Sequence, residues 1–325
     1  MVTGGAGVVG SYLVRELVKR GDRPLVLDTR AGPRFLAEFG GGAELVAADV
    51  TELAPLIDLF RHLRVEVVAH LAALTGSRAP DQPMVQFRVN MEGTMNILEA
   101  ARLAGVRRVI MASTRTVYPD FEGSPYGPPE YRPVPEDHPL CPDRPYEIWK
   151  QAGERIGRHY RERFGIEFAA FRFAPYYAAE WAERARLGGQ RVMGQVHGLI
   201  HHASRSLPAT LPGGADRPLD LIYVRDLAAG LVRALDAREL PSSAYNLGSG
   251  SLVTVRALCE ALLRLRPQAQ LAVGPGQDFA EGHYCLLDSS RAASELGFRP
   301  RFPLERGLQD CLERLAGFGS VRGSA

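Results

Sequence analysis

Thr3-Gly4-Gly5-Ala6-Gly7-Val8-Val9-Gly10 stands directly before a segment of helical apolar periodicity, and glycines occupy positions 4, 7 and 10 at intervals of three. In a strand-turn-helix unit such glycines make a tight turn, let the backbone approach a pyrophosphate and let the helix pack closely on the strand. The positive end of the following helix attracts the phosphates. The stretch predicts a dinucleotide-binding loop whose contacts to the cofactor come from Gly4, Gly7, Val8, Val9 and Gly10.

The residues after this loop alternate short apolar runs with segments of helical periodicity. The apolar runs predict strands at 24–28, 44–48, 67–71, 108–112 and 167–172. The segments between them predict helices at 9–20, 52–63, 84–104 and 146–164. This order is typical of an α/β fold with a doubly wound parallel sheet of the Rossmann type, in which crossover helices cover both faces.

The sequence pattern changes after about residue 174, where glycines and prolines frequently interrupt the apolar segments. We expect an NAD-binding Rossmann domain at 1–173, which also receives parts of about 218–248, and a smaller substrate-binding domain at 174–325. The proline-rich stretch 119–145 is predicted to be an ordered loop over the site. Later periodicity predicts a strand at 219–224 and helices at 226–238, 254–265, 289–296 and 304–316.

Only Met1 and Val2 precede the glycine loop, where the first and central strand of such a sheet should run. Strands usually contain five or six residues. Losing several buried residues of a central strand costs on the order of a few kcal/mol. We therefore expect either a true start upstream of Met1 or an abbreviated first strand.

Asp28 ends the second predicted strand, 18 residues after Gly10. A carboxylate at this place can accept hydrogen bonds from the adenosine ribose diol, and its charge repels a 2′-phosphate. The sequence therefore favours NAD over NADP as the cofactor, although the nearby Arg30 moderates that preference.

Lysine is rare in this chain, because only Lys19 and Lys150 are lysines among 39 basic side chains. Lys150 follows Tyr146 by four residues, and with 11 tyrosines the chance expectation of any such pair is roughly 0.07. Residues four apart share one face of a helix. The pair therefore predicts a phenol and an ammonium in one environment, which points to proton chemistry.

Composition narrows the class of protein. The 325 residues carry a formal net charge of +2, and their charges are interleaved, so no nucleic-acid or membrane contact is expected. The first residues resemble no signal peptide and no apolar run is long enough to span a membrane. The four cysteines lack the spacing of a disulfide framework or a metal knuckle. We expect a cytoplasmic protein without a metal site that acts on a small molecule.

Several further segments, taken with the glycine loop, resemble the extended short-chain dehydrogenase/reductase family. This group contains the NAD-dependent epimerases and dehydratases of sugar nucleotides, and the resemblance is closest to its sugar 4-epimerases. The match covers nearly the whole chain. Its segments are Asp49-Val50, His70-Leu71-Ala72-Ala73, Asn90-Met91-Glu92-Gly93-Thr94, Ser113-Thr114-Arg115-Thr116-Val117-Tyr118, Tyr146 with Lys150, Arg217 with 220–226, and Tyr245-Asn246-Leu247-Gly248.

The resemblance implies roles for these residues. Thr114, Tyr146 and Lys150 match the catalytic residues of the family, and Thr114, Arg115, Tyr146 and Arg217 are candidates to bind substrate. Family members form dimers through the helices at 84–104 and 146–164, so a homodimer is expected. The matched contacts to NAD beyond the glycine loop and Asp28 are Asp49, Val50, Leu71, Ala72, Ala73, Asn90, Tyr146 and Lys150.

Three of the matched polar residues also have a purely structural interpretation. His70, on an apolar strand, is more often a satisfied buried histidine than a catalyst. Asn90 could serve only as a hydrogen-bonding link between a helix and a loop. Asp49 could be the N-cap of a helix that begins at Thr51.

The chemistry expected from these residues is removal of a hydroxyl proton by Tyr146 as a hydride leaves for NAD. A phenol titrates near ~10, so a working value near ~7 requires roughly 4 kcal/mol of phenolate stabilisation. A cation about 4 Å away at an effective dielectric of ~20 supplies this amount, and Lys150 is the expected source. Thr114 would orient the substrate oxygen.

The type of reaction is narrowed by Arg115 and Thr116, which stand where the family's dehydratases carry an acidic pair. Dehydratase activity is therefore disfavoured. An epimerase remains the leading interpretation. The alternatives are an NAD-dependent dehydrogenase of a free sugar, sugar acid or polyol, and a catalytically silent dinucleotide-binding regulator.

The substrate is less well defined than the cofactor. Pro175 stands where family epimerases carry an asparagine, and 277–283 lacks their arginine-containing clamp on the diphosphate. Because of these departures, both a nucleotide sugar and a substrate without a nucleotide remain candidates. The arginines available to bind an anion are Arg78, Arg115, Arg184, Arg186, Arg191 and Arg217.

Overall fold

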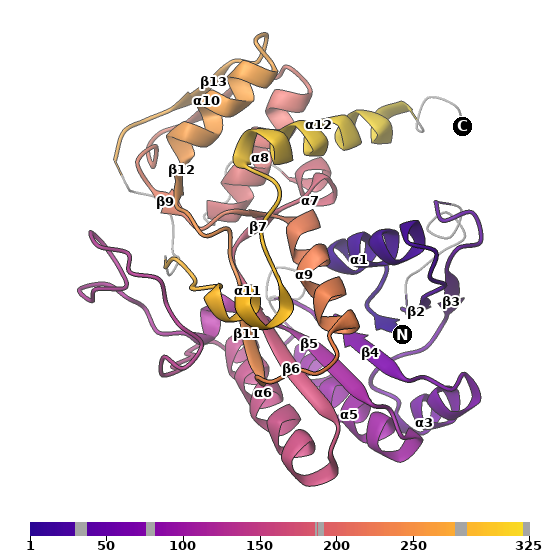
Figure 1. Ribbon diagram of the computed structural model, residues 1–325. Helices are drawn as coiled ribbons and strands as arrows, with labels where there is room; N and C mark the ends of the chain where they lie inside the picture. The colour runs from indigo at the N-terminus through magenta and orange to yellow at the C-terminus, as the bar shows by residue number, and fades with distance from the viewer. Residues whose placement is uncertain (30–37, 76–81, 186, 188–191, 277–284, 321–325) are drawn as a thin grey trace.

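A seven-stranded, all-parallel sheet forms the centre of the computed structural model, which describes residues 1–29, 38–75, 82–185, 187, 192–276 and 285–320. The strand order is β11-β6-β5-β4-β1-β2-β3 (Figure 1). This is the predicted Rossmann-type sheet with one more strand, contributed late in the chain. The strands are β1 Val2–Thr3, β2 Leu25–Leu27, β3 Glu44–Val46, β4 Val67–His70, β5 Arg108–Thr114, β6 Glu167–Phe173 and β11 Ala244–Leu247.

Helices cover both faces of this sheet, as the doubly wound pattern predicts. One face is covered by α1 (Val8–Lys19) and α9 (Val224–Asp236), which pack on each other. The other carries α3 (Leu53–His62), α5 (Gly93–Ala104) and α6 (Pro145–Phe164). Side chains alternate between two apolar cores along the strands, so that Ile110 joins one core while Val109 and Met111 join the other.

Most elements after β6, apart from α9, β11 and α11, form a smaller unit beside the sheet, seen in the upper part of Figure 1. Its helices are α7 (Ala179–Arg184), α8 (Val192–Ser204), α10 (Val255–Leu265) and α12 (Leu304–Ser320), whereas α11 (Ser290–Leu296) packs on β11. We propose the domain division expected from the sequence, with β11 in the first domain. The small strand pairs are β7 (Tyr176–Tyr177) with β10 (Ile222–Tyr223), β8 (Ala209–Leu211) with β13 (Leu271–Val273), and β9 (Pro218–Leu219) with β12 (Val253–Thr254).

The first strand is short, and it is nevertheless paired on both sides. Val2 and Thr3 of β1 pair with β2 on one side and with β4 on the other. The amino group of Met1 donates a hydrogen bond to the carbonyl of Val67 at 2.7 Å, which extends this pairing by one residue. The glycine loop therefore follows directly from a strand that is paired on both sides.

Two predicted elements differ from the observed ones. The single strand expected at 219–224 is interrupted, because β9 ends at Leu219 and β10 starts at Ile222. The buried Asp220 between them accepts hydrogen bonds from Ser249 N (2.8 Å), Ser249 Oγ (2.6 Å) and Leu287 N (3.0 Å), which turns the chain away from a ladder. The helix expected at 84–104 is continuous but compound, comprising α4 (Pro83–Phe87), a π-helical turn (Arg88–Glu92) and α5.

Candidate active site

The glycine loop closes tightly at the carboxyl end of β1. Gly4 has a φ of +65°, in the left-handed region, and a Cβ added there would lie 2.6 Å from Ala72 N. A Cβ on Gly10 would lie 2.3 Å from the carbonyl oxygen of Gly4. Gly7 donates to the same oxygen at 2.9 Å and is the N-cap of α1, without a side chain to cap the helix. The first amides of α1 are therefore left for an anion, as a pyrophosphate site requires.

Asp28 follows β2 and reaches the glycine loop. Its carboxylate accepts a hydrogen bond from Ala6 N at 3.1 Å, and the residue is half-buried. The acid predicted to bind the ribose thus stands beside the loop predicted to bind the phosphates. Arg30, which was expected to moderate the preference for NAD, lies outside the described residues.

Asp49 and Val50 lie in the turn between β3 and α3. The exposed Asp49 accepts a hydrogen bond from Thr51 N at 2.9 Å, while α3 begins at Leu53 with Glu52 as its N-cap. The interpretation of Asp49 as the N-cap of a helix beginning at Thr51 is therefore wrong. Val50 is buried, and its carbonyl accepts a hydrogen bond from Asn96 at 3.0 Å.

His70, at the end of β4, is a satisfied core residue. Its Nδ1 lies 2.8 Å from Thr3 Oγ1, and its Nε2 lies 3.1 Å from Thr94 Oγ1. Burial, reinforced by the positive charge of Lys150, lowers the pKa of His70 to about 3, so its imidazole is neutral at physiological pH. The structural interpretation of His70 is confirmed.

Asn90 holds the segment that follows β4. Its amide donates to the carbonyl of Leu74 and its oxygen accepts from the amide of Leu74, both at 2.8 Å. Thr3 anchors the other end, because Leu71 N donates to its carbonyl at 3.1 Å. Asn90 therefore acts as the predicted link between helix and loop, and it fixes the half-buried segment Leu71-Ala72-Ala73 next to the glycine loop.

The predicted catalytic residues come together where α6 crosses the end of β5. Thr114 is the last residue of β5, is half-buried, and has its Oγ1 3.0 Å from Thr116 Oγ1. Lys150 is only 2% exposed, and its Nζ donates to the carbonyl of Ala112 at 2.8 Å. One turn earlier on α6 stands the half-buried Tyr146, whose ring centroid lies 5.7 Å from Lys150 Nζ.

The electrostatics of this site bear on one expectation. Burial lowers the pKa of Lys150 to about 8, with the charge of Glu154 opposing the effect. Burial also raises the pKa of Tyr146 above its ordinary value, and the neighbouring Tyr176 and Glu147 raise it further. The expectation of a phenol near neutral pH therefore lacks the cost of removing the phenolate from water, and the effect expected from Lys150 stays a prediction.

The two arginines predicted to bind substrate act on different neighbours. Arg115 is buried, and its charge lowers the pKa of Cys285 and of Asp220, against the upward effect of their burial. Arg217 is half-buried, and its charge acts on Tyr131 in the long loop after β5. Arg184 ends α7, and Arg78, Arg186, Arg191 and 277–283 lie outside the described residues.

Two residues at the site carried no motif in the sequence. Tyr176 of β7 lies near Tyr146, and its hydroxyl accepts a hydrogen bond from Trp181 Nε1 at 3.4 Å. Glu154 stands one turn after Lys150 on the same face of α6 and is buried. The position of Glu154 at Lys150 + 4 was the available signal for it.

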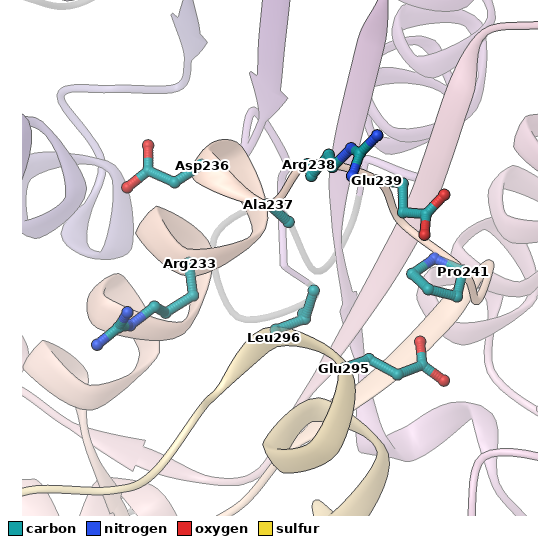
Figure 2. Close-up of a pocket in the computed structure, with 8 residues that line it drawn as sticks. All are labelled: Arg233, Asp236, Ala237, Arg238, Glu239, Pro241, Glu295 and Leu296. Carbon is teal, nitrogen blue, oxygen red and sulfur yellow. The ribbon is translucent and has the colours of Figure 1, made fainter.

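A separate surface pocket lies at the other end of the strands, away from the glycine loop (Figure 2). It is formed between the end of α9, the start of β11 and α11, close to the amino end of β5, where Arg108 donates to the carbonyls of Ala234 and Ala237. Ligands of open α/β sheets bind outside the carboxyl ends of the strands. This pocket is therefore not the candidate active site. Its lining residues are Arg233, Asp236, Ala237, Arg238, Glu239, Pro241, Glu295 and Leu296.

Comparison with known families matches residues 1–248 to the model of the NAD dependent epimerase/dehydratase family. The chain belongs to this family. It is accordingly an NAD-dependent enzyme of the extended short-chain dehydrogenase/reductase type. Three features of the site fit that cofactor: the glycine loop, which has no room for further Cβ atoms, the start of α1, which no side chain caps, and Asp28.

Individual family members are similar along their whole length. A UDP-glucose 4-epimerase of Mycolicibacterium smegmatis is 31% identical over 326 residues, covering 96% of this chain and 97% of that protein. A putative UDP-glucose 4-epimerase of Methanocaldococcus jannaschii is 29% identical over 311 residues, covering 95% of both chains.

Solved structures agree with these relatives. The Thermus thermophilus UDP-glucose 4-epimerase in complex with NAD has a TM-score of 0.78 at 27% identity, over 97% of this chain and 98% of that one. MoeE5 in complex with UDP-glucuronic acid and NAD has a TM-score of 0.78 at 29% identity, over 98% of both chains.

Replacing Asp28 tests how this family member selects its cofactor. Asp28→Asn keeps the shape of the side chain and an acceptor for Ala6 N, but removes the negative charge. We expect the Kd for NAD to rise about tenfold, because a charge-assisted hydrogen bond is lost, and the Kd for NADP to fall because a repulsion is removed. Titrations of both dinucleotides measure the two constants, with the exposed Asp58→Asn as a control of equal charge. An unchanged ratio of the two constants in Asp28→Asn would contradict this role.

Proposed function

We propose that this enzyme is an NAD-dependent epimerase that inverts a hydroxyl-bearing carbon of a nucleotide sugar, with a UDP-sugar as the favoured substrate class. The observation that supports the proposal is that Lys150, next to Tyr146 on α6, donates to the carbonyl of Ala112 near the end of β5, two residues before Thr114. Relatives and solved structures named as UDP-glucose 4-epimerases, similar over nearly the whole chain, support the substrate class.

Tyr146 is the proposed base, which takes the proton of the reacting hydroxyl and returns it after inversion. When bound, NAD supplies a reversible hydride acceptor for the carbon that carries this hydroxyl. Lys150 is held by the carbonyl of Ala112 and can donate its remaining protons to the cofactor's ribose and toward the phenol. The hydroxyl of Thr114, at the rim of β5, orients the substrate oxygen.

The protein's own groups favour the neutral phenol of Tyr146, since burial, Tyr176 and Glu147 all raise its pKa. Lys150 opposes this effect with one positive charge, and the positive nicotinamide of the oxidised cofactor adds a second. The proposed base is therefore created by cofactor binding, which limits proton removal to the enzyme that is ready for hydride transfer.

Two other reactions remain as alternatives. A dehydrogenase of a free sugar, sugar acid or polyol would use the same three residues and release a ketone. A dehydratase is disfavoured, because Arg115 and Thr116 stand where elimination needs acidic side chains, and the buried Arg115 cannot act as an acid at physiological pH.

The substrate class and the base are tested in one assay. UDP-glucose, UDP-glucuronic acid and unattached sugars are incubated with the purified enzyme, and sugar isomers and NADH are followed together. We expect isomerised UDP-sugar without accumulating NADH, and a loss of about 10²–10⁴ in kcat for Tyr146→Phe with an unchanged Kd for NAD.

Other outcomes of this assay have distinct meanings. NADH that accumulates with substrate would favour the dehydrogenase. The absence of both products across the panel would favour the silent regulator. Undiminished turnover by Tyr146→Phe would refute Tyr146 as the base.

We also propose a homodimer formed through α4, α5 and α6. These neighbouring helices expose large apolar side chains, and Phe87 of α4 packs edge-on against Trp149 of α6 with ring centroids 6.2 Å apart. Exposed large apolar side chains on neighbouring helices are typical of protein interfaces. Its exposed members are Met84, Val85, Phe87, Leu103, Ile148 and Phe164.

Introducing a charge tests this interface. We expect sedimentation to show a dimer for the wild type and a monomer for Ile148→Glu, because burial of an unpaired carboxylate is unfavourable. Leu207→Glu, at an exposed apolar residue remote from these helices, serves as the control. A wild-type monomer, or a dimer retained in Ile148→Glu, would contradict the proposed interface.

The protein's location is proposed from its thiols. All four cysteines are free, and burial raises the pKa of Cys259, Cys285 and Cys311. Free thiols of this kind fit the reducing cytoplasm. In the described residues, no helix is long and apolar enough to cross a membrane.

A further inference from the structure

A buried ion pair lies directly behind the candidate catalytic residues. Glu154 of α6 and Arg172 of β6 form it, with Arg172 Nη2 2.6 Å from Glu154 Oε2 and Arg172 Nε 3.1 Å from Oε1. Both side chains are at most 7% exposed. Ser113 of β5 donates to Glu154 Oε1 at 2.5 Å. One carboxylate therefore joins the catalytic helix to the two neighbouring strands of the sheet.

This carboxylate is linked to the elements that carry the candidate catalytic groups. Ser113 immediately precedes Thr114 in β5, and Glu154 follows Lys150 by four residues, on the same face of α6. A change in the position of Glu154 would therefore alter the spacing between the residue that orients the substrate oxygen and the residues that handle its proton.

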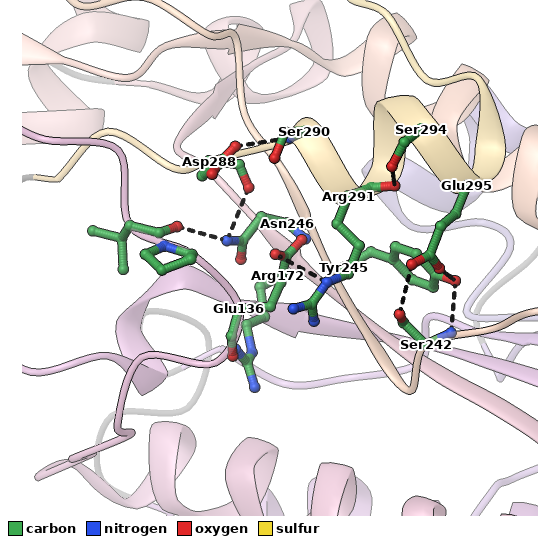
Figure 3. Close-up of polar contacts among 12 residues, drawn as sticks. Glu136, Arg172, Ser242, Tyr245, Asn246, Asp288, Ser290, Arg291, Ser294 and Glu295 are labelled. Atoms are coloured by element: carbon green, nitrogen blue, oxygen red, sulfur yellow. Dashed lines mark hydrogen bonds and ion pairs between the residues drawn. The ribbon is translucent and has the colours of Figure 1, made fainter.

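Arg172 anchors the pair in the opposite direction. Its Nη1 donates to Tyr118 Oη and to the carbonyl of Glu136, both at 2.8 Å. Tyr118 donates to Asn246 of β11 at 2.9 Å, and Asn246 N donates to Glu136 Oε1 at 2.8 Å. Figure 3 shows this outer part, where Glu136 also meets Arg291 of α11 at 3.5 Å. A buried polar network in which every member is hydrogen-bonded holds its groups in one arrangement.

The charges around Lys150 are few. His70 of β4 is neutral, the carbonyl of Ala112 is the acceptor on β5, and Tyr146 is the neighbour on α6. The carboxylate of Glu154 is the group whose charge favours the ammonium form of Lys150 against burial. Arg172 supplies the compensating positive charge on the far side of that carboxylate.

We propose that Glu154 and Arg172 are positioning residues for the reaction: they lock α6 against β5 and β6 so that Lys150 and Tyr146 face Thr114, and Glu154 provides the negative charge that balances the Lys150 ammonium. This inference rests on the proposed function for the identity of the reaction. The charge balance does not depend on which alcohol is oxidised.

The composition of the chain provides a direct probe of this balance. Lys150 and Lys19 are its only lysines, and Lys19 lies on the surface with its side chain 59% exposed. Nuclear magnetic resonance of protein labelled with ¹³C at the lysine side chain therefore yields two titration curves. Lys19→Arg, which should retain full activity, assigns them.

The variants are expected to move the Lys150 curve in different ways. Glu154→Gln removes the balancing negative charge and leaves Arg172, so the pKa of Lys150 should fall from about 8 by about one unit or more, while that of Lys19 stays in place. Arg172→Met removes a positive charge and leaves the carboxylate, so the pKa of Lys150 should stay or rise. If Glu154 and Arg172 served only to pack α6 on the sheet, the two variants would not shift the pKa of Lys150 differently.

Kinetics supply the second measurement. Activity that needs the Lys150 ammonium declines as pH rises through the pKa of Lys150. We therefore expect the basic limb of the kcat profile of Glu154→Gln to move to lower pH by the same amount as the Lys150 curve, with little change in KM. Glu154→Met combined with Arg172→Met replaces the pair by apolar side chains that can keep the fold. This double variant should show a smaller fall in the pKa of Lys150 than Glu154→Gln, because the charge of Arg172 is removed as well, together with a loss of turnover.

A matched ion pair at the other end of the same strands provides the control. Arg108 of β5, which is fully buried, meets Glu167 of β6 at 2.7 Å. Glu167→Gln should lower the Tm of the protein without moving the Lys150 curve or the kcat profile. A shift of the Lys150 curve in this control would assign the effect to general loosening and overturn the proposal.

The remaining outcomes separate the two proposals. If the wild type is active, and both Glu154→Gln and the double variant leave the Lys150 curve and the kcat profile unchanged from the wild type, the positioning role is overturned and the proposed function stays intact. A wild type inactive on all sugars, in which Glu154→Gln still lowers the pKa of Lys150, would refute the proposed function and retain the charge balance.

Discussion

The Lys150 ammonium is almost completely removed from water, and a buried cation has to be stabilised by the groups that surround it. Its ammonium group donates a hydrogen bond to the carbonyl of Ala112, and the negative charge of Glu154 opposes the downward effect of burial on its pKa. Glu154 lies on the same helix as Lys150, whereas the hydrogen bond to Ala112 exists only if α6 lies across the end of β5 in one position. The network from Ser113 through Arg172 to Asn246 fixes that position.

Buried polar side chains near β1 and β4 are likewise satisfied by partners within the protein. His70 is held between Thr3 and Thr94 and stays neutral, so it adds no second positive charge next to Lys150. Asn90 satisfies both polar groups of Leu74, which keeps the segment after β4 beside the glycine loop. These residues build the shape of the site, whereas Tyr146 and Lys150 are the residues proposed for its proton chemistry.

The sequence predicted those features that depend on local spacing. The glycine loop, Asp28 and the Tyr146–Lys150 pair were found because each is a short pattern with a direct physical meaning, and helix α6 differs from its predicted range by one residue at its start. The interruption at Asp220 was missed, because its partners Ser249 and Leu287 are distant in sequence. The pair of Glu154 and Arg172 was missed for the same reason. The upward effect of burial on the pKa of Tyr146 was not predicted, because burial depends on the whole fold and no spacing reveals it.

The central claim is that the protein alone holds Tyr146 as a neutral phenol and that the charge of bound NAD converts it into a base. Ultraviolet difference titration of the wild type against Tyr146→Phe, with and without saturating NAD, measures the ionisation of this one phenol. The account predicts a pKa above the ordinary value of ~10 without NAD and a fall by several units toward neutrality with it. A Tyr146 that ionises near neutral pH without NAD, or that ignores its binding, would contradict the account.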